Sequence, residues 1–213
     1  IRAMNPIGII FTGGPNSVYD PKSPQVDPAI FTWGVPILGI CYGCQLMAHN
    51  LGGRVTEAQD DSAREYGKTE TYFDSACKLF KGLPAQGITW MSHGDYMEKV
   101  PEGFALVAHS DACPNVAICD EGRGFYGVQY HPEVNHTEHG TDMIRNFLYE
   151  VCGAAGDWTM GDYKESSIKA HPGEGGRRQG VAGSVRRRGF QPGISHLRLR
   201  IKEAGETSHH IFL

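Results

Sequence analysis

The stretch Pro36-Ile37-Leu38-Gly39-Ile40-Cys41-Tyr42-Gly43 joins an apolar run to a cysteine that has a glycine two residues to either side. Such a run without alternation predicts a strand buried on both faces of a sheet. Helical spacing from Gln45 to Ala48, ended by Leu51-Gly52-Gly53, predicts that a helix follows. Because glycine lets a helix pack close to a strand, the stretch predicts a sharp strand-to-helix turn with Cys41 at its apex.

Patterns elsewhere predict more elements of the same kind. Residues 7–11 form an apolar run that ends in a glycine loop, and residues 125–130 form another, so both are expected to be strands. Residues 141–152 place their apolar side chains on one helical face. Between residues 54 and 117 strands and turns prevail, with the clearest strands at 68–73, 87–91 and 105–108. We therefore expect an α/β fold with a mixed, mostly parallel sheet flanked by helices.

The segment His131-Pro132-Glu133, directly after the last predicted strand, supplies partners for Cys41. A cysteine nucleophile needs a base nearby and a third group that orients the base. Positions two apart on an extended segment share a face, so Glu133 is placed to hold His131. A buried structural cysteine before a helix is the commoner arrangement. The His-Pro-Glu segment is what favours a nucleophile, at a helix N-terminus that stabilises thiolate.

Two further features bear on this chemistry. Thr12-Gly13-Gly14-Pro15 ends a predicted strand and can direct backbone N–H groups at a developing oxyanion. It is a poor phosphate loop, because no Gly-Lys-Ser/Thr follows. His136 and His139 come soon after Glu133 and leave a metal site as an alternative, although no ligand pattern with zinc spacing accompanies them.

Three segments resemble the class I glutamine amidotransferases: the glycine loop at 13–15, Gly-Ile-Cys-Tyr-Gly-Cys-Gln at 39–45 and Gly-Val-Gln-Tyr-His-Pro-Glu-Val at 127–134. Within that family the chain is most similar to the GMP synthase branch. Tyr42 after the cysteine and Met-Ser-His-Gly-Asp at 91–95 are typical of that branch. The resemblance covers residues 1–169.

The resemblance implies a flavodoxin-like fold and a glutaminase that supplies ammonia for amination of XMP to GMP. The implied residues are the triad Cys41, His131 and Glu133, the oxyanion donors Gly14 and Tyr42, and the glutamine-binding residues Gly13, Gln45, Ser92 and Asp95. An ordinary polar turn is the alternative for Ser92 and Asp95. The family implies no cofactor or metal in this domain. ATP and Mg²⁺ would act in a partner, the GMP synthetase (ATP-pyrophosphatase) domain or subunit.

The cysteines and the apolar runs of the sequence indicate the cellular compartment and whether a membrane is a partner. None of the six cysteines has a small disulfide-scaffold spacing, no signal peptide is visible, and no apolar run reaches the ~18 residues of a membrane span. We therefore expect free thiols, a cytoplasmic location and no membrane partner. The alternative functions are a γ-glutamyl hydrolase-like activity, an inactive partner-binding fragment and a stand-alone amidotransferase subunit.

Both ends of the chain depart from the family. We expect the amidotransferase domain, residues 1–169, to lack its first strands, to leave a sheet edge exposed and to be marginally stable. Residues 170–213 are expected to be a disordered basic tail. Residues 171–213 hold eight Lys/Arg and three Glu, a net +5, which leaves −9 for the rest of the chain.

The change in composition at His171 has a candidate origin in the reading frame. Shifting the codons of residues 171–192 by one base permits Ser-Gly-Gly-Val-Asp-Ser-Ser, the phosphate loop of the ATP-pyrophosphatase domain. We therefore interpret the tail as a frameshifted start of that domain. A genuine basic arm that contacts nucleic-acid phosphates is the alternative, and nucleic acid is not the expected partner.

Overall fold

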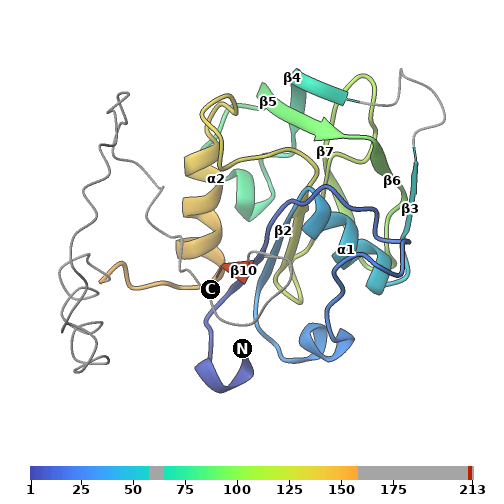
Figure 1. The fold of residues 1–213 in the computed structure, drawn as a ribbon. Helices are drawn as coiled ribbons and strands as arrows, with labels where there is room; N and C mark the ends of the chain where they lie inside the picture. Colours follow the sequence, from blue (N-terminus) through green and yellow to red (C-terminus); the bar gives the residue numbers. More distant parts are fainter. Residues whose placement is uncertain (58–64, 158–210, 213) are drawn as a thin grey trace, which may run out of the picture. The chain divides into compact units, whose positions relative to one another are not determined.

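The computed structural model describes residues 1–57, 65–157 and 211–212. The chain divides into two compact units, and the fold below is that of the described residues in the unit that contains residues 1–154 and 211–212. Its main feature is an eight-stranded sheet of order β10-β1-β2-β9-β8-β7-β4-β5 (Figure 1). In chain order these strands are β1 (Ile9–Phe11), β2 (Ile37–Ile40), β4 (Glu65–Phe73), β5 (Gln86–His93), β7 (Ala105–His109), β8 (Ala117–Asp120), β9 (Phe125–Val128) and β10 (Ile211–Phe212).

A second, two-stranded sheet and several helices complete the described part of the chain. The small sheet pairs β3 (Arg54–Glu57) with β6 (Asp95–Lys99). The α-helices are α1 (Tyr42–Asn50) and α2 (Gly140–Asn146), and α2 continues as a π-helical turn, η5 (Phe147–Val151). Short 3₁₀ turns are η1 (Arg2–Met4), η2 (Pro28–Thr32) and η4 (Lys78–Phe80).

The sheet is mixed, as predicted, and its parallel part contains the strand that leads into Cys41. Strands β1, β2 and β9 pair in parallel, whereas the pairings from β9 outward through β8, β7, β4 and β5 are antiparallel. The physical reason is connection length: short turns such as that between β8 and β9 can join only antiparallel neighbours, while parallel strands need long crossovers.

The central strands are covered on both faces, which explains their uninterrupted apolar sequence. Ile37 of β2 packs in a buried cluster with Met47 of α1. The next residue, Leu38, belongs to the largest buried cluster together with Met143 of α2 and Phe147 of η5. Successive strand residues point to opposite faces, so α1 and α2 lie on opposite sides of the sheet (Figure 1).

The outer edge of β1, expected to lack a partner, pairs with β10. Ile10 is opposite Phe212 and Phe11 is opposite Ile211, in antiparallel register. These two residues are the described portion of the predicted tail, and the rest of the 170–213 prediction lies outside the described residues. Marginal stability of the chain stays a prediction.

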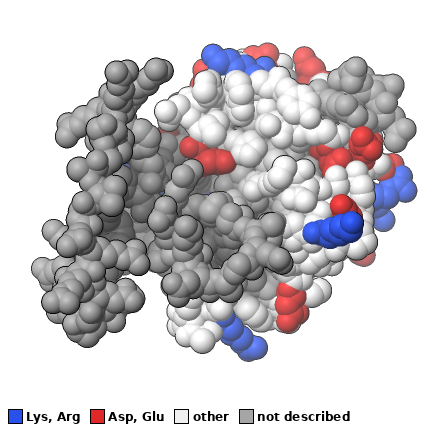
Figure 2. All heavy atoms as spheres, in the orientation of Figure 1, with Lys and Arg blue, Asp and Glu red and all other residues white. Residues whose placement is uncertain are grey.

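The described surface carries charges of both signs. On the face in Figure 2, acidic and basic side chains lie interspersed around largely uncharged surface. Exposed ion pairs include Arg54 with Glu98 and Lys81 with Glu150. Within the described ranges, no helix combines the length and the apolar character needed to cross a membrane.

Candidate active site

Cys41 stands at a strained turn between β2 and α1, as the sequence predicted. Its backbone has φ 51° and ψ −111°, a conformation that costs a non-glycine residue of order 1–3 kcal/mol. Its N–H donates to the carbonyl of Val128 at 2.8 Å, so β9 holds the turn in place. A Cβ at Gly39 would lie 2.7 Å from the backbone of the following helix, and one at Gly43 would collide with Phe11. The glycines flanking Cys41 are therefore required by close packing.

His131 and Glu133 form the predicted pair beside this cysteine. Nδ1 of His131 lies 2.7 Å from Oε1 of Glu133, and the side chains are 18% and 40% exposed. Hydrogen bonding to the Cys41 thiol, and then to the Glu133 carboxylate, raises the pKa of His131 to about 10 against the opposing effect of burial. The imidazolium is thus the favoured form near neutral pH, held between a sulfur and a carboxylate.

The glycine loop after β1 faces the same centre. A Cβ added at Gly13 would lie 2.8 Å from Cε1 of His131 and 3.4 Å from Cβ of Cys41, so only glycine leaves room for both side chains. Gly14, the next residue, is exposed, and its Cβ position lies 3.7 Å from the Tyr42 ring. The two predicted oxyanion donors, Gly14 and Tyr42, therefore lie next to each other, one in the glycine loop and one at the start of α1.

The predicted glutamine-binding residues gather on one side of Cys41. The carbonyl of exposed Ser92 in β5 accepts a contact from Cys41 Sγ at 3.9 Å. Half-buried Asp95 begins β6, and its Oδ1 accepts from the Tyr19 hydroxyl at 3.1 Å. Gln45 is buried, and its amide donates to the Asp95 carbonyl at 2.8 Å and to Gln129 Oε1 at 3.1 Å. The Gln45 side chain thus holds the backbone of Asp95 in place.

Thr137 is a site residue that the sequence reasoning missed. Its buried hydroxyl accepts from the Trp90 N–H at 2.9 Å and donates to the His131 carbonyl at 2.6 Å. The His131 N–H in turn donates to the Trp90 carbonyl at 3.0 Å. These three bonds tie the base to β5, the strand that carries Ser92. A threonine six residues after a histidine carries no recognisable signal, because the contact depends on the fold.

The nearby histidines have other partners, which bears on the metal alternative. The His136 ring stacks on Trp90 with centroids 4.6 Å apart. His139 Nδ1 lies 3.4 Å from Asp142 Oδ2. Neither belongs to the three-residue group of potential metal ligands found among the described residues, which lies elsewhere. Chemically, the centre offers a nucleophile, a protonated base and an orienting carboxylate, the requirements for acyl transfer.

Comparison with known proteins identifies the family of this chain. Residues 1–151 match the family Glutamine amidotransferase class-I. The glutamine-hydrolyzing GMP synthase of Clostridium perfringens is 54% identical over 168 residues, and that of Geobacillus kaustophilus is 53% identical over 169. Each alignment covers 79% of this chain and 32% of the relative, so the chain spans about a third of these relatives.

Solved structures give the same result for the fold. A Thermoplasma acidophilum protein proposed to be one of the subunits of a GMP synthase superimposes with a TM-score of 0.58 at 30% identity, covering 76% of both chains. A Thermotoga maritima glutamine amidotransferase has a TM-score of 0.51 at 19% identity, covering 76% of this chain and 65% of that one, a likeness of fold alone. Because the family match spans well over half of its residues, this chain belongs to the class I glutamine amidotransferases.

Proposed function

We propose that this chain is the glutaminase part of a GMP synthase, which hydrolyses glutamine to supply ammonia for amination of XMP to GMP. The observation that carries the proposal is the placement of His131 between Cys41 and Glu133 at a strained turn. Identity of 54% to a glutamine-hydrolyzing GMP synthase supports the choice of branch. The Met-Ser-His-Gly-Asp segment at 91–95 lies beside the thiol and supports it further.

The geometry supports a two-step acyl transfer. Cys41 acts as a thiolate beside the protonated His131, and its sulfur attacks the side-chain carbonyl carbon of glutamine. N–H groups of Gly14 and Tyr42 would hold the oxyanion, each such donor contributing about 3 kcal/mol to the transition state. His131 then protonates the leaving nitrogen, and the C–N bond breaks to release ammonia and leave a γ-glutamyl thioester. Water attacks the thioester and gives a proton to His131, and the C–S bond breaks, which yields glutamate and restores the thiolate and the imidazolium.

The remaining residues would select the substrate. The Asp95 carboxylate suits the α-ammonium group of glutamine, and Ser92 lies on the strand that borders the thiol. Gln45, whose amide already bonds Asp95 and Gln129, would act by fixing Asp95. Gly13 would keep the space between His131 and Cys41 open.

We assign ATP and Mg²⁺ to a synthetase partner, since no step of glutamine hydrolysis needs them. Two arrangements of that partner are open: a domain of the same polypeptide, as the length of the relatives suggests, or a separate subunit. The Thermoplasma acidophilum protein, which matches this chain over 76% of both lengths, favours the separate subunit, which is the second candidate. Six free thiols support a cytoplasmic location.

The test distinguishes the reactivity of Cys41 from the dependence of glutamine hydrolysis on a synthetase partner. Cys41→Ala should abolish release of ammonia from glutamine, measured with and without an added synthetase partner. Because hydrolysis in this family is commonly coupled to the synthetase site, covalent labelling by an electrophilic glutamine analogue is measured in parallel. The expected result is one label per chain on Cys41, absent from Cys41→Ala and slowed by glutamine. Substantial activity in Cys41→Ala, or labelling of another cysteine, would overturn the triad assignment.

A further inference from the structure

Three potential metal ligands meet at the end of the sheet opposite Cys41. Cys77 precedes η4, Cys119 lies in β8, and Glu121 follows β8 in the turn to β9. The two sulfurs and a carboxylate oxygen all lie within 4.8 Å of one another. Phe125, just after this turn, pairs with Ile37 at the start of β2, whereas Cys41 follows the end of β2. The cluster is therefore separate from the glutaminase centre.

The spacing suits a tetrahedral ion. Zn–S bonds of about 2.3 Å and Zn–O bonds of about 2.1 Å place tetrahedral ligand atoms about 3.6–3.8 Å apart. Contraction of at most about 1 Å, within reach of cysteine χ1 rotation, would bring the three ligands to that geometry. Cys77 and Cys119 are each 4% exposed, while the Glu121 side chain is 38% exposed and gives the cluster a side open to solvent.

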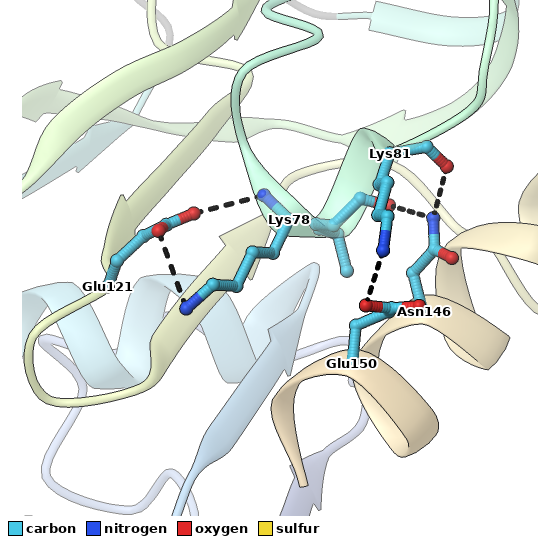
Figure 3. Close-up of polar contacts among 6 residues, drawn as sticks. Lys78, Lys81, Glu121, Asn146 and Glu150 are labelled. Atoms are coloured by element: carbon cyan, nitrogen blue, oxygen red, sulfur yellow. Dashed lines mark hydrogen bonds and ion pairs between the residues drawn. The ribbon is translucent and has the colours of Figure 1, made fainter. Parts of the chain in front are cut away.

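The ligands are held in place before any ion binds. The Lys78 N–H donates to Oε1 of Glu121 at 3.0 Å, and Lys78 Nζ lies 3.7 Å from Oε2 (Figure 3). The other end of η4 is fixed by Asn146, whose Nδ2 donates to the carbonyls of Leu79 at 3.0 Å and Lys81 at 2.9 Å. The turn that follows Cys77 is thus bonded to two different parts of the fold.

The charges at the cluster also favour a cation. A divalent ion with two thiolates and one carboxylate carries −1, which the Lys78 ammonium offsets. Burial of the thiols makes a compensating ion more favourable than an isolated thiolate.

A buried tyrosine hydroxyl provides a second, independent observation. Tyr126 of β9 is fully buried and lies directly opposite Cys119 in the β8–β9 register, so the two side chains share a face. Its hydroxyl has no hydrogen-bond partner among the described residues. Buried polar groups nearly always have a partner, so an unpaired hydroxyl on the side chain opposite Cys119 indicates a missing ligand.

We propose that Cys77, Cys119 and Glu121 bind a thiophilic divalent cation such as Zn²⁺, with a water in the fourth position hydrogen-bonded to the Tyr126 hydroxyl. Thiolate ligands select Zn²⁺ or Cd²⁺ over Mg²⁺ and Ca²⁺. The ion would link η4 to the β8–β9 turn and so stabilise the fold at the end remote from catalysis. The site does not depend on the proposed glutaminase function.

The test uses the full chain with Cys41→Ser as background, because the catalytic thiol and His131 would compete for soft metals. Reduced protein is titrated with Cd²⁺, followed by the ultraviolet thiolate-to-cadmium charge-transfer band, and with Zn²⁺ against a chromophoric chelator. We expect one ion per chain and no competition from Mg²⁺. Cys77→Ser and Cys119→Ser should each weaken affinity at least about 100-fold, and Glu121→Gln about 10-fold.

A control variant tests whether any loss of metal binding is specific to the three proposed ligands. Cys152→Ser, which changes a thiol packed against the same core but outside the ligand trio, should bind as the background does. If the cysteine variants fold poorly, Glu121→Gln, altered at a solvent-facing carboxylate, carries the test, and Zn²⁺ should raise its melting temperature less than that of the background. Absence of saturable binding, or binding that none of the three substitutions weakens, overturns the proposal. So does a Cys77–Cys119 disulfide whose reduced form binds no metal.

Discussion

Replacing Thr137 by valine tests how firmly the structure holds the catalytic base. The substitution removes a hydroxyl and keeps the side-chain volume, so no cavity arises. It deletes the 2.9 Å bond from the Trp90 N–H and the 2.6 Å bond to the His131 carbonyl. Each of these partly buried backbone groups left unpaired costs about 1–3 kcal/mol. We expect a total loss of about 1–5 kcal/mol in the free energy of unfolding, since the two unpaired groups cost about 2–6 kcal/mol together and the added methyl recovers about 0.8 kcal/mol.

The effect on catalysis should exceed that on stability, because the freed carbonyl belongs to His131. A displacement of about 1 Å in a reacting group can cost about 100-fold in rate. We expect kcat, or the rate of Cys41 labelling, to fall about 10–100-fold in Thr137→Val with a smaller change in KM. Thr137→Ser, which keeps the hydroxyl, should recover most of the activity.

The matched control is Thr71→Val. Thr71 is equally buried, and its hydroxyl bonds the Thr89 hydroxyl at 2.7 Å, but β4 pairs it with Gly87, five positions before Ser92 along β5. It should lose about 1–2 kcal/mol of stability and keep its activity. Stability is measured by urea unfolding and activity by ammonia release. Equal activity losses in the two valine variants, or no rescue by Thr137→Ser, would refute the positioning role.

Two further predictions concern the triad. Gly13→Ala should lower the rate of ammonia release at least about 10-fold, because the new Cβ would lie 2.8 Å from His131. Gly14→Ala should lower that rate less, because the nearest atom to its Cβ is 3.7 Å away. A larger loss in Gly14→Ala than in Gly13→Ala would contradict this reasoning. His131 gains its proton affinity on folding, so its stabilisation is complete below about pH 6.5 and is lost as pH rises toward about 10. The free energy of unfolding, measured in urea, should therefore differ less and less between wild type and His131→Gln as pH rises, by about 1 kcal/mol per pH unit across this window. A difference that grows with pH would contradict the prediction.

The local sequence was sufficient to predict those strands and helices that depend mainly on their own residues. The apolar run before Cys41 and the helical spacing after it predicted β2 and α1, because burial on both faces and a glycine-flanked turn leave little choice. The His131–Glu133 contact followed from two positions on one extended segment. Strands β3, β6 and β8 were not predicted individually, since short strands depend on neighbours more than on their own residues.

What the sequence by itself determined was the mixed α/β class and the proximity of His131 to Glu133, and the roles of Cys41, His131 and Glu133 stay predictions. Only the tertiary structure decided which distant residues meet them. Thr137 bonds both the His131 carbonyl and the N–H of Trp90, which is 47 residues away, and Gln45 meets Gln129 across 84 residues. Cys77 and Cys119 come together in the same way, from η4 and β8. Such contacts leave no periodic signal, because they arise from strand order and register, which are set by burial of the whole sheet.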